Sequence, residues 1–171
     1  MKGDHFEANH FYQDIKGVRH IHSILCDNDL FFISTGDSKK YLDKWGFCNG
    51  EIRFIGRVMS TFAGFTGCCT VQNKHYFGTD FSERPNYIYC LENEKKFFLP
   101  EPAYTQFFAG MIPVNDRFIF CMNMSMPHSH PNRSISIFDT FNYSYVYCQA
   151  YEHYELAHSP WAFCFQPKLG K

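Results

Sequence analysis

Several features that would identify a functional class directly are missing from this sequence. Its 171 residues carry a formal net charge of −1, and its lysines cluster in nothing larger than pairs such as Lys39-Lys40, so the field that nucleic-acid binding needs is absent. No apolar run approaches the length that crosses a bilayer. The first residues, MKGDHFEANHFYQD, are polar and acidic and lack the apolar segment of a secretory signal. We therefore expect a cytoplasmic protein that binds neither nucleic acid nor membranes.

Motifs for nucleophilic, phosphate and zinc-ribbon chemistry are also missing. The sequence contains no G-x-S-x-G, no G-x-x-x-x-G-K-[ST] and no C-x-x-C. We expect no cofactor. Without a secretory signal, the cysteines within apolar strand-like runs are predicted to be reduced and to act as small buried hydrophobic residues. These are Cys26, Cys68, Cys69, Cys90, Cys121, Cys148 and Cys164.

Helical patterns are scarce, whereas aromatic residues are abundant. No long stretch repeats apolar residues at helical spacing, and the chain has 20 Phe, 11 Tyr and 2 Trp. Aromatic residues suit the half-buried surface of a sheet, so the composition favours an all-β fold. The length is typical of one domain with a real core, and we expect residues 1–171 to form a single domain.

An internal repeat organises the chain. Three segments each read as a strand, an Asn-centred turn and a second strand: HIHSILCDNDLFFISTGD, FTGCCTVQNKHYFGTD and FFAGMIPVNDRFIFCMN. Their turn residues are Asn28, Asn73 and Asn115, so the separations are 45 and 42 residues. Asn at these positions tolerates left-handed or Asx-turn geometry.

Each repeat continues with further strands. The predicted third strands are EIRFIGRVM from Glu51, NYIYCLE from Asn86 and SISIFDT from Ser134, each after a loop. Fourth strands are predicted in at least two units, as KKFFLP from Lys95 and YSYVYCQA from Tyr143.

Four antiparallel strands that recur every 40–50 residues or so are typical of β-propeller blades. We predict three blades, in residues 18–61, 62–105 and 106–153, with 154–171 as a strand or tail; a meander or sandwich is the alternative. Propellers close with about four to eight blades, so three form a partial or half ring. Missing blades or a second copy in a homo-oligomer would complete it.

The stretch RHIHSILCDNDLFFISTGD, followed by HYFGTDFSERPNYIYCLE, resembles the sialidase-like (BNR-type) β-propeller proteins of bacteria, over about Val18 to Phe120. The resemblance implies a propeller fold, which hosts hydrolases, lyases and binding modules. The Asp-box S-x-D-x-G-x-T-W of true sialidases is absent, and no arginine triad or tyrosine nucleophile is recognisable. The resemblance therefore implies the fold rather than sialidase activity.

Polar residues are predicted to gather at one end of the blades. The start of a blade's first strand and the end of its second meet at the same rim, and residues two apart on a strand share a face. The candidate ligand-binding residues are Arg19, His20, His22, Thr35, Thr79 and Asn123, beside the carboxylates Asp37 and Asp80. Hydrogen bonding within the channel and capping of the following loops are the alternative roles.

Two functions follow from this rim. The first is recognition of a glycan or other small molecule, with Arg84 as a clamp for a carboxylate or phosphate and with Tyr76, Tyr87 and Tyr104 as apolar faces for sugar rings. Asp37 and Asp80 are the candidate acid and base of a glycoside hydrolase, if they are suitably spaced. The second function is a non-catalytic interaction or assembly module, which the short length favours.

The loop NMSMPHSHPNRS carries His128 and His130. An H-x-H pair can bind a metal through two imidazoles. No acidic or cysteine ligand lies close in the sequence, so we expect a polar loop without a metal.

Overall fold

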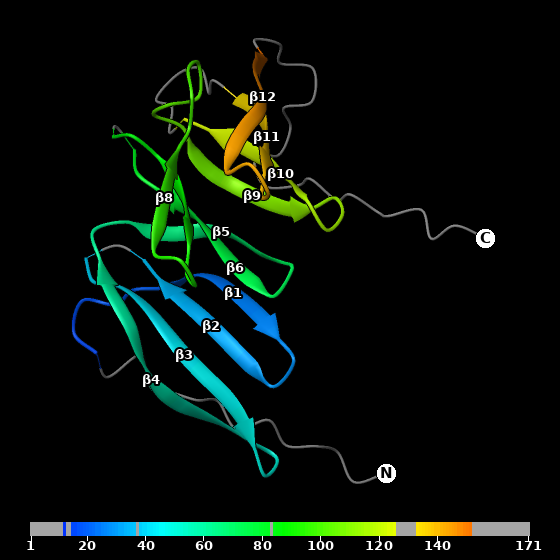
Figure 1. Cartoon of the computed structure of the whole chain (residues 1–171). Coiled ribbons are helices and arrows are strands. Elements are labelled where there is room, and N and C mark those ends of the chain that lie inside the picture. The colour runs from blue at the N-terminus through cyan, green and yellow to red at the C-terminus, as the bar shows by residue number, and fades with distance from the viewer. Residues whose placement is uncertain (1–11, 13–14, 37, 83, 126–132, 152–171) are drawn as a thin grey trace, which may run out of the picture.

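The computed structural model describes residues 12, 15–36, 38–82, 84–125 and 133–151. Within these ranges all regular structure is β, in three antiparallel four-stranded sheets that follow one another along the chain (Figure 1). The predicted all-β fold of three propeller-type blades is therefore confirmed. The described residues include no helix able to cross a membrane.

The first sheet contains β1 (Ile21–Asp27), β2 (Leu30–Thr35), β3 (Lys40–Cys48) and β4 (Glu51–Thr61) in sequential order. The prediction for this unit was wrong in one respect, because residues 40–48 form a strand rather than a loop. This strand was not recognised in the sequence because it contains two lysines and Asp43. The Asp43 side chain is buried and tolerates burial because Arg57 on β4 donates to both of its carboxylate oxygens, at 2.9 and 3.3 Å.

The second sheet contains β5 (Gly64–Val71), β6 (Lys74–Asp80), β7 (Tyr87–Cys90) and β8 (Lys95–Phe98). The third contains β9 (Phe107–Pro113), β10 (Phe118–Met124), β11 (Arg133–Asp139) and β12 (Ser144–Tyr151). The predicted third and fourth strands of these two units are confirmed.

The asparagine turns have the predicted geometries. Asn28 and Asn73 adopt left-handed backbone, with φ of +52° and +58°. Asn115 uses its side chain instead, because its Oδ1 accepts the amides of Arg117 and Phe118 in an Asx turn. The three inner hairpins are thus closed by the residue that the repeat identified.

Two apolar cores lie between consecutive sheets. The first core combines Leu25, Phe32 and Leu42 of the first sheet with Phe65 and Phe77 of the second. The second core is built mainly from the facing sides of the second and third sheets, and it includes Cys69, Tyr76, Ile88, Phe108, Met111 and Phe138. Each large side chain buried in this way contributes about 1.5–3 kcal/mol to folding.

The innermost strands also contact one another, β1 with β5 and β5 with β9. The Ser23 hydroxyl donates to the Phe65 carbonyl at 2.6 Å, and the Thr66 hydroxyl donates to the Phe108 carbonyl at 2.5 Å. Phe65 and Phe108 are equivalent in the repeat, so similar hydroxyl contacts tie each sheet to the next.

Thr35 and Thr79 occupy equivalent positions in the first two sheets, and their hydroxyls make equivalent hydrogen bonds. Each is fully buried, and each hydroxyl accepts an amide of the next strand: Tyr41 for Thr35 and Tyr87 for Thr79, both at 2.9 Å. The hydroxyls donate in turn, Thr35 to the Lys39 carbonyl and Thr79 to the Asn86 side chain. They therefore hold the loop between the second and third strands of a sheet.

Replacing Thr79 by Val tests this role. Val keeps the volume but leaves the buried Tyr87 amide without an acceptor, which costs about 1–3 kcal/mol. Denaturant unfolding should show this loss, and hydrogen exchange of the Tyr87 amide should accelerate. Thr79→Ser is the control, because it keeps the hydroxyl and should keep the Tyr87 amide protected. Equal protection in the Val and Ser variants would contradict the assignment.

Candidate ligand-binding cleft

The structure brings together part of the predicted rim. The His22 Nδ1 lies 3.3 Å from a carboxylate oxygen of Asp80, although the two residues belong to different sheets. The His20 ring stacks on the His22 ring, with centroids 4.6 Å apart. His20, His22 and Asp80 therefore form one cluster where β1 begins and β6 ends.

A β-bulge explains the direction of His22. The register of β1 and β2 shifts between Ile21 and Ser23, so His22 is the extra residue, and a bulge re-aims the side chain at that position. The ring lies against two glycines. A Cβ on Gly36 would be 1.7 Å from the His22 Nε2, and one on Gly64 would be 2.3 Å from its Nδ1. Glycine at both places lets the imidazole fill the space beside the second sheet.

The remaining predicted residues are placed differently. Arg19 is exposed just before β1, while Thr35, Thr79 and Asn123 are buried inside their sheets. The Asn123 amide donates to Ser136 at 2.8 Å, so it serves the third sheet internally. Asp37, His128 and His130 lie outside the described residues, so the carboxylate pair and the H-x-H pair have no described geometry.

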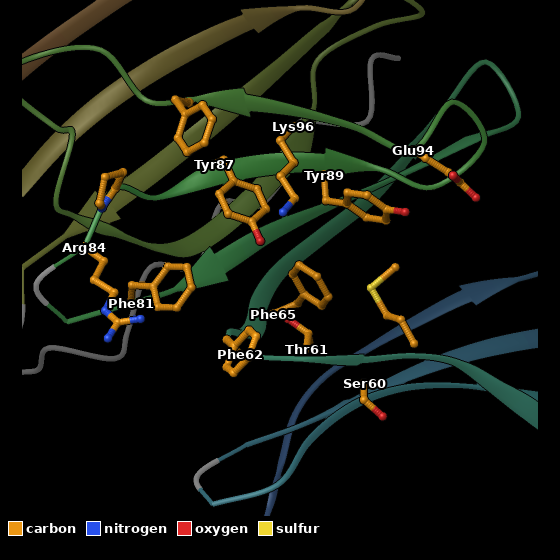
Figure 2. A pocket seen from close by; sticks show the side chains of 13 residues that line it. Ser60, Thr61, Phe62, Phe65, Phe81, Arg84, Tyr87, Tyr89, Glu94 and Lys96 are labelled. Carbon is orange, nitrogen blue, oxygen red and sulfur yellow. The ribbon is translucent and has the colours of Figure 1, made fainter.

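A cleft of about 550 Å³ opens between the end of β4 and the outer half of the second sheet (Figure 2). Its lining is aromatic, with a few polar and charged groups. The residues are Met59, Ser60, Thr61, Phe62, Phe65, Phe81, Arg84, Pro85, Tyr87, Tyr89, Glu94, Lys96 and Phe98. Phe62 is 89% exposed and Phe98 is 51% exposed, so the cleft offers apolar rings directly to solvent.

The charges of the cleft favour an anion. Arg84 and Lys96 are its two cations and Glu94 is the one carboxylate among its described lining residues, which leaves one net positive charge. The Lys96 ammonium lies 5.0 Å from the centre of the Tyr87 ring, a cation–π contact that holds it over the lining. Arg84 and Glu94 lie at opposite ends of the cleft (Figure 2).

Asn86 organises the loop that carries Phe81 and Arg84. Its Oδ1 accepts the Phe81 amide at 2.9 Å, and its Nδ2 donates to the carbonyls of Phe81 and Arg84, at 3.0 and 3.2 Å. The Asn86 residue is fully buried, so the loop is fixed from inside. This role of Asn86 was not predicted; an Asn directly after Pro85 in a loop was the available signal.

The hydroxyl of Tyr89 is held in its neutral form. Burial is the main cause that raises its pKa, and the carboxylate of Glu94 is the next. A tyrosine hydroxyl is already neutral at pH 7, and the raised pKa extends that range, so the phenol can donate a hydrogen bond at the cleft.

The predictions for the tyrosines and the cysteines are confirmed in part. Tyr87 lines the cleft, whereas Tyr76 is buried in the second core and offers no face to a ligand, so that prediction was wrong. All seven described cysteines are free. Cys69, Cys90 and Cys121 are buried as predicted, and burial raises the pKa of each thiol. Against the prediction, Cys26 is exposed and Cys68 and Cys148 are half-buried, while Cys164 lies outside the described residues.

A second polar bridge, at the far end of the first two sheets, was not foreseen. The His75 ring has its Nε2 2.9 Å from Asp27, and its Nδ1 contacts Glu92. The two carboxylates engage different nitrogens of the one ring. The described part of the chain has no cluster of three or more His, Cys, Asp or Glu suited to a metal.

No protein-family model matches the chain, and no curated protein matches it.

Gly36→Ala tests the packing of His22. The added methyl must displace the imidazole and break its contact with Asp80, and overpacking of this kind costs about 1–3 kcal/mol. Gly56→Ala is the matched control, because its Cβ meets no atom within 4 Å. Thermal unfolding and the NMR signals of the His22 ring report the effect. Equal stability and unchanged His22 signals in both variants would refute it.

Proposed function

We propose that this chain is a carbohydrate-recognising module of the β-propeller type, and that the cleft binds a sugar carrying an acidic group. The observation that carries the proposal is an open aromatic cleft furnished with an arginine and a lysine. Its volume of about 550 Å³ falls within the range of about 300–1,000 Å³ that is usual for small-molecule sites. The three propeller-type sheets are compatible with this function, since the propeller fold hosts binding modules as well as hydrolases.

Each part of the cleft suits one part of such a ligand. The exposed rings of Phe62 and Phe98 can pack against the C–H faces of a sugar, since aromatic rings bury apolar area in a specific orientation. Arg84 presents a planar fork that matches a carboxylate or sulfate. Ser60, Thr61 and the protonated Tyr89 supply hydroxyls for the ligand's own hydroxyls.

The same geometry favours binding over cleavage. Glycoside hydrolases place two carboxyl groups about 5–10 Å apart around the scissile bond. Among the described lining residues Glu94 is the one carboxylate, and Asp80 is paired with His22 and is not part of the lining. We therefore propose retention of the intact glycan. The alternative function, an assembly module, is favoured by the apolar outer faces of the first and third sheets.

Binding to a panel of uronate-containing, sulfated and neutral oligosaccharides tests the proposal by calorimetry. Acidic members should bind and neutral ones should bind more weakly, with an affinity that falls as salt rises. Arg84→Gln and Lys96→Gln should each weaken binding about tenfold, equivalent to about 1.4 kcal/mol. Phe62→Ala should weaken the binding of acidic and neutral oligosaccharides to the same extent.

Phe141→Ala is the control for these variants. Phe141 is 55% exposed in the turn before β12 and lies outside the cleft lining, so its loss should leave the affinity unchanged. Absence of binding to every member of the panel would refute the function. Release of reducing ends from a bound oligosaccharide would show that the chain hydrolyses its ligand, which would contradict the proposal that the glycan stays intact.

A further inference from the structure

Equivalent positions form the packing surface of every sheet. The hairpin registers align Leu25 of the first sheet with Cys69 of the second, and Leu42 with Ile88. All four are buried. Leu25 and Leu42 lie on the side of the first sheet that meets the second sheet, and Cys69 and Ile88 lie on the side of the second sheet that meets the third. We call this side the forward face of a sheet, and the opposite side its backward face.

The third sheet has a forward face of the same kind. Ile112 and Ile135 occupy the positions of Leu25 and Leu42, as the pairing of β9, β10 and β11 shows. No fourth sheet follows in the part of the chain that the structure describes, and both side chains are only half-buried.

The first sheet presents a matching backward face on β1 and β2. On the β3 part of this face Asp43 and Trp45 are buried, and the Tyr12 hydroxyl bonds to both. Ile24 on β1 and Ile33 on β2 align with Cys68 and Phe77 in the second sheet, which pack in the first core. Ile24 is nevertheless 51% exposed, and its neighbour Ile21 is 44% exposed. The three described sheets therefore leave one forward face, and the β1–β2 part of one backward face, outside the two cores, and surfaces of these two kinds already pack together twice within the chain.

We propose that a second copy of this chain covers both faces, with the forward face of each copy packed on the backward face of the other. The two contacts are equivalent under one two-fold axis, so the assembly closes into a ring. Two copies of three sheets give six, within the four to eight that close a propeller. The proposal is independent of the cleft, which lies between two sheets of a single chain.

The molar mass in solution tests this directly. Light scattering after size exclusion should give about 40 kDa, twice the 20.1 kDa of one chain. A mass of one chain at every concentration would overturn the proposal. A mass that grows beyond two copies would overturn it as well, because an open stack does not close.

Charged variants test which surfaces meet. Ile24→Glu on the backward face and Ile135→Glu on the forward face should each shift the mass from about 40 to about 20 kDa. Val114→Glu is the matched control, since Val114 is 60% exposed in the β9–β10 turn and lies on neither face; it should leave the mass unchanged. Loss of folded structure is checked by circular dichroism.

Mixing the two variants sharpens the test. The forward face of the Ile24→Glu chain and the backward face of the Ile135→Glu chain are both intact, so the mixture should recover dimer that neither variant forms alone. A contact between like faces, or two misfolded variants, would give no recovery and would overturn the proposal.

Thiol labelling gives a readout on the unaltered chain. Cys26 on the backward face and Cys48 at the end of β3 are both exposed in one chain, so Cys48 is an internal reference. Alkylation of Cys26 should be slowed relative to Cys48 and restored by Ile135→Glu, which leaves the surroundings of Cys26 untouched. Equal rates in the unaltered chain would overturn the proposal. Protection that persists in Ile135→Glu would do the same, since the chain's own segments would then cover Cys26.

Discussion

The face-to-face packing of consecutive sheets is the constraint on which the rest of this structure depends. The second sheet shows it most clearly, because all four residues of β7 are buried although alternate ones point to opposite faces. Ile88 packs toward the third sheet, while Tyr87 and Tyr89 pack toward the first. Alone, this sheet would expose apolar area on both sides, so its stability depends on both neighbouring sheets.

The same constraint creates the cleft. The sheets approach most closely at their inner strands, where hydroxyl groups on β1 and β5 bond to the carbonyls of the next sheet. The cleft lies farther out, between the end of β4 and the strands β7 and β8. Phe65 reaches both regions, since it is part of the first core and of the cleft lining. The floor of the candidate binding site is therefore the outer edge of the core, which gives it rigidity.

The periodic features of the fold, its strands and turns, could be predicted from the sequence. The features that depend on single polar contacts between distant residues could not. Hairpins closed by Asn28, Asn73 and Asn115 follow from local turn chemistry and apolar runs, and both are visible in the chain. The strand at residues 40–48 was hidden because Asp43 is buried through a partner on another strand. The contact of His22 with Asp80 was anticipated in outline, since strand ends of neighbouring blades converge. The cleft was not, because its lining comes from four separate segments whose proximity depends on how the sheets pack.

Two histidine bridges mark the ends of the first interface between sheets. His22 meets Asp80 at one end, and His75 lies between Asp27 and Glu92 at the other. Apolar packing between them is non-directional and would tolerate a sliding of one sheet over the other. The two histidine bridges do not tolerate such sliding, because a displaced imidazole loses its carboxylate partner. The apolar core thus supplies most of the stabilisation, while the bridges select one alignment of the two sheets, and that alignment sets the width of the cleft they enclose.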